Sequence, residues 1–214
     1  MENDKHVFCD ASVRAYGACL YARHTVDNST EVNLIYSRNK LAPVKKVNIP
    51  RLELLAALLN VRLLQNFCRE MNMNSYTAIL WSNSTVILSW IKGDPNRWKT
   101  FICNRTTDIL QYIIPTRWRH WPGTDNPVDH LTRGTFPSQL STLESWWHSL
   151  KWLTRNPEIW PTNDLSSQPL LEVELQKMEF QFFYVTTLEP IVDIYPYNSY
   201  TKLLLVVAWI LRFV

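Results

Sequence analysis

Cysteine is scarce in this sequence, and its placement excludes two common uses. The four cysteines, Cys9, Cys19, Cys68 and Cys103, form no CxxC pair, and none stands at zinc-ligand spacing from a histidine. Cys9 and Cys19 lie inside apolar runs, which favours buried thiols. We therefore expect neither a disulfide framework nor a zinc site, and we expect a reducing compartment.

Long apolar runs and a strong excess of one charge are also lacking. The run Leu203–Val214 has twelve residues and is interrupted by Arg212, whereas about 20 are needed to span a bilayer. The N-terminal residues Met1–Lys5 are polar and contain no apolar stretch of a signal peptide. These features predict an intracellular protein with no membrane partner. The net charge of +3 is compatible with phosphate contact but does not by itself indicate nucleic-acid binding.

The hydrophobic content is high enough for a folded core. Hydrophobic residues make up 46% of the chain and charged residues 19%, a balance typical of globular proteins. Ten tryptophans and twelve prolines stand against four glycines, and the tryptophans crowd between Trp81 and Trp160. We expect most of these indole rings to serve as core and linker anchors.

Hydrophobic spacing predicts a mixed α/β fold. Pro50 suits the first turn of a helix, and Leu52, Leu55, Leu59 and Leu63 then repeat at helical spacing. Strands are predicted at 6–24 (two strands), 31–37, 78–81 and 117–121, and helices at 50–71, from 83 or 84 to about 90, at 101–113 and at 126–131, with Gly134 as the stop of the last. This order implies a mixed sheet with helices packed on its faces.

We divide the chain into three parts. Residues 6–135 form the α/β domain, and residues 136–195 form an irregular Trp/Pro-rich extension and linker with docked aromatic anchors. Residues 196–214 are predicted as an apolar helix that is cut before a further region.

Three carboxylates lie where chemistry could use them. Asp10 ends the first strand, Glu53 is expected in the first turn of the long helix, and Asp129 belongs to the last short helix. Clustered carboxylates need bound cations or raised pKa values, and their hard oxygens suit Mg²⁺ or Mn²⁺. Each also has a structural interpretation, because Asp10 could begin a turn, the helix dipole favours Glu53, and Asp129 could be a surface acid.

Six motifs in order resemble a known family. They are HVFCDAS at 6–12, AYGACLYAR at 15–23, IPRLELLAAL at 49–58, WSNSTVILSWI at 81–91, FICNR at 101–105 and NPVDHLTRG at 126–134. Together they look like the ribonuclease H-like region of Bel/Pao-type LTR retrotransposon Pol polyproteins, and the resemblance covers about residues 6–160. It implies a ribonuclease H-like mixed sheet flanked by helices.

The resemblance also implies a site of four acids, and this sequence departs from it at one position. Asp10, Glu53 and Asp129 match the acids of the first strand, the first helix and the last helix. Asn83 stands where the family pattern has an aspartate after the fourth strand. Because Asn is neutral and offers one carbonyl oxygen, binding of Mg²⁺ or Mn²⁺ should be weakened.

The resemblance thus implies a Pol-derived domain that ancestrally hydrolyses RNA in RNA–DNA hybrids by two-metal catalysis, with activity weak or absent because of Asn83. The alternative is a non-catalytic nucleic-acid-binding or connector domain of a degenerate or domesticated retroelement protein. Implied partners are an RNA–DNA hybrid and the adjoining reverse transcriptase and integrase regions, in the cytoplasm or a virus-like particle.

Basic side chains offer candidate nucleic-acid contacts. These are Arg38, Lys40, Lys45, Lys46, Arg117 and Arg119. Cations serve phosphates and flat aromatic faces serve bases, although a solvated surface explains such charges equally well. For His120 a structural role in a strand is favoured over general-base chemistry, and His130 is expected to be an exposed helix residue.

Overall fold

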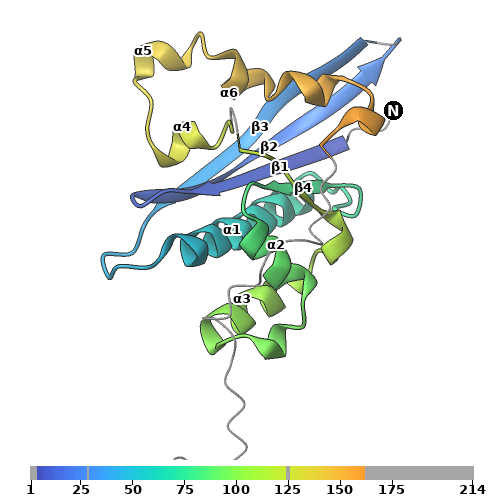
Figure 1. Ribbon diagram of the computed structural model, residues 1–214. Helices are drawn as coiled ribbons and strands as arrows, with labels where there is room; N and C mark the ends of the chain where they lie inside the picture. Colours follow the sequence, from blue (N-terminus) through green and yellow to red (C-terminus); the bar gives the residue numbers. More distant parts are fainter. Residues whose placement is uncertain (1–3, 28, 124–125, 162–214) are drawn as a thin grey trace, which may run out of the picture. The chain divides into compact units, whose positions relative to one another are not determined.

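The computed structural model describes residues 4–27, 29–123 and 126–161 (Figure 1). The remainder of the predicted extension, 162–195, and the predicted apolar helix, 196–214, lie outside the described residues. Within the described ranges, no helix has both the length and the apolar character needed to cross a bilayer.

Five strands form one mixed sheet in the order β3-β2-β1-β4-β5. The strands are β1 (Asp4–Ala11), β2 (Ala15–Val26), β3 (Ser29–Leu41), β4 (Ile79–Ser82) and β5 (Trp118–His120). β1, β2 and β3 pair antiparallel, whereas β4 runs parallel to both β1 and β5. The predicted mixed sheet is confirmed, and β4 lies inside it, between β1 and β5.

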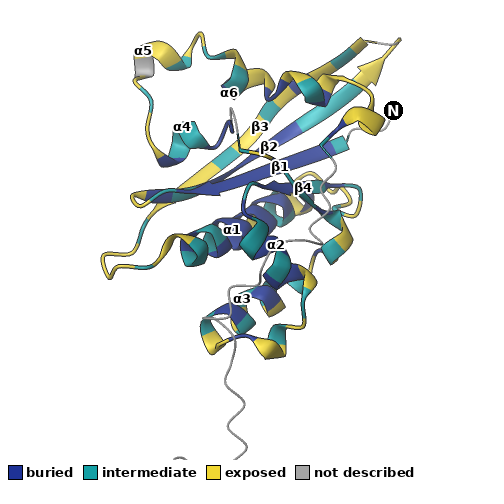
Figure 2. Cartoon of the chain, in the orientation of Figure 1, coloured by how far each residue is buried: buried dark blue, intermediate teal, exposed yellow. Residues whose placement is uncertain are grey.

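The strand β3 is longer than the predicted 31–37 because it is an edge strand. Most of its side chains are exposed, whereas β1 is buried over nearly its whole length (Figure 2). An exposed edge strand needs no apolar alternation, so its polar ends carry no sequence signal.

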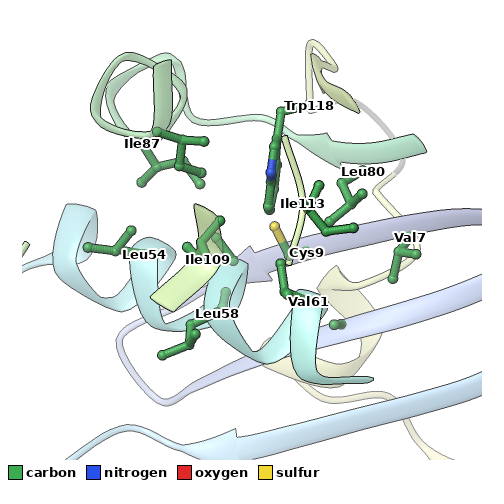
Figure 3. Packing of buried hydrophobic residues seen from close by; sticks show 14 of the residues in the cluster. Val7, Cys9, Leu54, Leu58, Val61, Leu80, Ile87, Ile109, Ile113 and Trp118 are labelled. Carbon is green, nitrogen blue, oxygen red and sulfur yellow. The ribbon is translucent and has the colours of Figure 1, made fainter. Parts of the chain in front are cut away.

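Helices α1 (Ile49–Glu70) and α2 (Thr85–Lys92) pack on one face of the sheet, and α3 (Thr100–Leu110) packs against these two helices. The Asn48 side chain caps α1 by accepting a hydrogen bond from the backbone N–H of Arg51. Of the predicted leucine stripe, Leu52, Leu59 and Leu63 are buried and Leu55 is half-buried. Figure 3 shows how side chains of α1 pack with those of α2, α3 and β5; Leu54, Leu58, Val61, Ile87, Ile109 and Trp118 are labelled there.

Short elements and tryptophans cover part of the other face. They are α4 (Asp129–Thr132), α5 (Pro137–Leu140), α6 (Glu144–His148) and the 3₁₀ turns η3 (Lys151–Thr154) and η4 (Pro157–Ile159); two further 3₁₀ turns, η1 (Pro95–Arg97) and η2 (Pro115–Arg117), flank α3. The Tyr21 hydroxyl donates to the Trp146 carbonyl at 2.8 Å, and the rings of Trp81 and Trp152 lie 4.9 Å apart. Residues 136–161 therefore share an aromatic core with the sheet.

The helix predicted over 126–131 is shorter and begins later. The Asn126 side chain accepts from the Val128 N–H, so these residues form a turn and α4 starts at Asp129. Gly134 follows with a φ of +92°, which is the left-handed conformation that ends a helix.

Candidate acidic metal site

Strand pairing brings Asp10 and Asn83 together. β1 and β4 are parallel with Cys9 opposite Ser82, so the next residue of each strand reaches the same edge of the sheet. The Asn83 Nδ2 donates to Asp10 Oδ1 at 3.1 Å, and the Thr132 hydroxyl donates to Asp10 Oδ2 at 3.0 Å. Both carboxylate oxygens of the buried Asp10 are thus engaged.

Asp129 joins the site from the start of α4. Burial, followed by a hydrogen bond with Asp129 and the charge of Asp129, raises the pKa of Asp10 to about 6, although the donors Thr132 and Asn83 oppose the rise. Asp129 Oδ2 also lies 3.5 Å from Arg133 Nε, in a largely exposed ion pair that contributes little stability.

Glu53 approaches from α1. Burial raises its pKa, a hydrogen bond with Ser84 opposes this, and the charge of Asp10 adds to the rise. Glu53 lies beyond the first turn of α1, not within it as predicted. Since the effect of the helix dipole fades after the first turn, the dipole alone does not explain this half-buried acid.

Asn83 occupies the fourth position of the site, after β4, and does not cap α2. The cap is Ser84, whose hydroxyl accepts from the Ile87 N–H, so α2 begins after Ser84. The Asn83 Oδ1 atom is buried and has no hydrogen-bond partner among the described residues. A Cβ at Gly123, which has a φ of +87°, would lie 3.4 Å from Asn83 Cβ, so this loop fits closely over the amide.

The three predicted acids are neighbours, but they do not form a ligand cage. In the part of the chain that the structure describes, no three acidic, histidine or cysteine side chains are grouped closely enough to hold one metal ion. The donor set still suits a hard cation, because it offers the carboxylates of Asp10, Glu53 and Asp129 and the amide oxygen of Asn83.

Thr132, Ser12 and Ser84 position the acids, and their roles were not predicted. The Ser12 hydroxyl donates to the Thr132 carbonyl at 2.7 Å, which ties α4 to the turn after β1. Thr132 stands three residues after Asp129, a spacing that places both on one face of a helix. This spacing was the sequence signal from which the role of Thr132 could have been predicted.

The predicted basic residues separate into different surroundings. Arg38 and Lys40 lie on exposed β3, and Lys45 and Lys46 lie in the exposed loop before α1. Arg117 ends the turn η2.

Arg119, the last of these candidates, stacks over the rings of Trp81 and Trp160, 5.8 Å from each centroid, which indicates a packing role.

The two histidines also differ. His120 lies on β5, as expected for a structural residue, and burial lowers its pKa. The prediction that His130 is exposed is wrong. It is half-buried, with Nδ1 3.2 Å from the Thr135 hydroxyl and Nε2 3.4 Å from the Ser145 hydroxyl, because α6 folds back over α4.

The raised pKa of Asp10 predicts a pH-dependent stability. Because the native state holds this proton more tightly than the unfolded chain, the free energy of unfolding should fall as pH rises from about 4 to about 6. A rise of the pKa from 3.8 to about 6 corresponds to roughly 2–3 kcal/mol. We expect Asp10→Asn to remove most of this slope in urea unfolding with EDTA present, whereas Glu70→Gln, at an exposed carboxylate, should leave it unchanged. Equal slopes in the native protein and Asp10→Asn would contradict the assignment.

The chain thus folds as a mixed five-stranded sheet with helices, with an acid at the end of β1 and others carried by α1 and α4. Residues 2–84 match the family model described as the Pao retrotransposon-like RNaseH-like domain, which confirms the predicted resemblance over this part of the chain. Among solved structures, RNase H1 from the halophilic archaeon Halobacterium salinarum NRC-1 is similar, at 12% identity and a TM-score of 0.38, over 57% of this chain and 89% of that chain. Comparison with curated proteins gives no match.

Proposed function

We propose that this chain provides a ribonuclease H-like domain that binds RNA–DNA hybrids and in which cleavage of the RNA strand is weak or lost. The observation that carries this proposal is the hydrogen bond from Asn83 Nδ2 to Asp10 Oδ1. An amide N–H directed at a carboxylate occupies the place in which a cation would lie between two carboxylates. Asn83 also removes one negative charge from the set that would hold Mg²⁺.

Asp10, Glu53 and Asp129 would hold Mg²⁺ or Mn²⁺, with weakened affinity. Such ions, when bound, supply an activated water and stabilise the leaving oxygen of a phosphodiester. The chain's own contribution is to hold the carboxylates: Thr132 fixes one oxygen of Asp10, and Ser84 contacts Glu53. Turning the Asn83 amide would present its unpaired oxygen to the ion in place of its N–H.

A non-catalytic connector is the second candidate function, and the same hydrogen bond favours it. Asn83 and Thr132 together donate to both oxygens of Asp10, so these oxygens have hydrogen-bond partners without a metal. A connector would keep the fold for contacts with nucleic acid or with adjoining reverse transcriptase and integrase regions of a polyprotein. In that case millimolar Mg²⁺ would leave the melting temperature unchanged, and Glu53→Gln would not alter hybrid affinity.

The proposal predicts binding of a fluorescently labelled RNA–DNA hybrid without metal. We expect a Kd of about 1–100 μM, the usual range for contacts made mainly to phosphates. Fluorescence anisotropy in EDTA measures it, and Mg²⁺ should then leave most of the RNA intact during an incubation in which an active ribonuclease H control degrades it. Failure to bind any hybrid at low salt would refute the proposal, and rapid cleavage would show that three acids suffice.

A further inference from the structure

A pocket separate from the acidic site lies between the paired strands β2 and β3 and the helix α1. It is a cavity of about 280 Å³, and its polar lining comes from Tyr16, Arg38, Lys40, Arg62, Gln65 and Asn66. Among the residues that the structure describes, no carboxylate lines it. Three cations thus face one small space that contains donors and no anionic acceptor.

Strand register explains why the cations meet there. Arg38 pairs with Ala18, and Lys40 pairs with Tyr16. Because alternate residues of a strand share a face, both basic side chains lie on the side of the sheet that buries Ala18 against the core containing α1. Arg62 of α1 completes the set from the helix.

The existing ion pair of Arg62 does not neutralise the pocket. Arg62 lies 3.4 Å from Asp108, but both side chains are about half exposed, and such pairs are weak. Like charges lining one cavity repel one another, so an anion that enters it relieves this repulsion. The planar guanidinium groups suit phosphate, and the hydroxyl of Tyr16 and the amides of Gln65 and Asn66 add neutral donors.

Part of the pocket lining lies at the same end of the sheet as the acidic site. Tyr16 on β2 pairs with Ala11 on β1 and with Lys40 on β3. These three residues form one row across the sheet, and Ala11 is the residue next to Asp10. At about 4.8 Å between strands, the Lys40 backbone is roughly 10 Å from that of Ala11. This distance corresponds to about three nucleotides of rise along one strand of a duplex.

We propose that this Arg38–Lys40–Arg62 pocket binds a backbone phosphate of a nucleic-acid strand that lies across the acidic site. The inference rests on the proposed function and deepens it by assigning where the strand is held. Binding there depends on charge and not on base identity. It also needs no metal, since none of the pocket side chains belongs to the acidic site.

The test is the salt dependence of hybrid binding by the full chain in EDTA, measured by anisotropy between 50 and 200 mM NaCl. For the double variant Arg38→Gln/Lys40→Gln we expect roughly tenfold weaker binding, the equivalent of one charge-assisted contact. The slope of log K against log[salt] should fall by about 0.9, the value for one phosphate. Arg62→Gln should act in the same direction.

The matched control is Lys92→Gln/Arg97→Gln, which removes the same charge from exposed positions outside the pocket. It should change affinity less than twofold and leave the slope unchanged. If the two double variants show the same hybrid affinity and the same salt dependence, the pocket does not bind a phosphate, although the chain still binds hybrid. Absence of hybrid binding by the native chain would overturn the proposed function itself. Circular dichroism melting of each variant verifies that the fold is retained.

Discussion

Replacing Asn83 by Asp is expected to raise Mg²⁺-dependent cleavage of RNA in an RNA–DNA hybrid by at least about 100-fold. Losing one well-placed electrostatic group typically costs a factor of about 10²–10³, and here the group would be restored. Cleavage of a 5′-labelled RNA strand, followed by gel electrophoresis under single-turnover conditions, measures the gain.

The geometry supports this gain because the substitution changes little else. Asn83 and Asp have the same shape, and the cap of α2 is supplied by Ser84. The new carboxylate would stand at the present position of Nδ2, 3.1 Å from Asp10 Oδ1. Two carboxylates so close repel each other, so the variant should be less stable than the native protein in EDTA and should regain stability when Mg²⁺ is added.

Two further variants separate catalysis from folding. Asn83→Asp combined with Glu53→Gln should bind hybrid as the single variant does but lose the gained cleavage. Asn83→Ala should remove the hydrogen bond to Asp10 without supplying a carboxylate and should remain inactive. If the aspartate variant binds hybrid and Mg²⁺ yet cleaves nothing, Asn83 is not what silences the domain.

Much of the site could be predicted because its parts lie on strongly patterned elements. β1, α1 and β4 have clear apolar signals, and the family resemblance implied that Asp10, Glu53 and Asn83, which these elements carry, belong to one site. The hydrogen bond between Asp10 and Asn83 could not be predicted, since it depends on the register of parallel strands that are far apart in sequence. The role of Thr132 was missed because its hydrogen bond joins α4 to the end of β1, which is 122 residues away in the sequence.

The weakly patterned parts were predicted less well. Residues 126–128 had helical character, but the Asn126 side chain bonds to the backbone of Val128 and forms a turn instead. His130 appeared exposed because nothing local shows that α6 packs over it. Arg119 was grouped with the phosphate-binding candidates, whereas tertiary packing places it over Trp81 and Trp160.

Substitution of Trp160 tests whether the compact domain extends beyond residue 135. Its ring is 4% exposed and lies 5.0 Å from His6 and 6.1 Å from both Trp81 and Trp152. It thereby closes the aromatic cluster beneath β4, the strand that presents Asn83. If residues 136–161 were only a linker, removing this ring would have little effect on the sheet.

We expect Trp160→Ala to lower the free energy of unfolding by about 3–5 kcal/mol, the usual loss for truncating a buried tryptophan. Trp147→Ala is the control, because that ring is 43% exposed, and its indole N–H bonds only locally to the Leu140 carbonyl. Its loss should stay below about 1 kcal/mol. Urea denaturation followed by circular dichroism compares the two. Equal small losses would place the boundary of the stable domain before α5, whereas the expected difference makes the sheet that carries Asp10 and Asn83 dependent on the tryptophans that follow it.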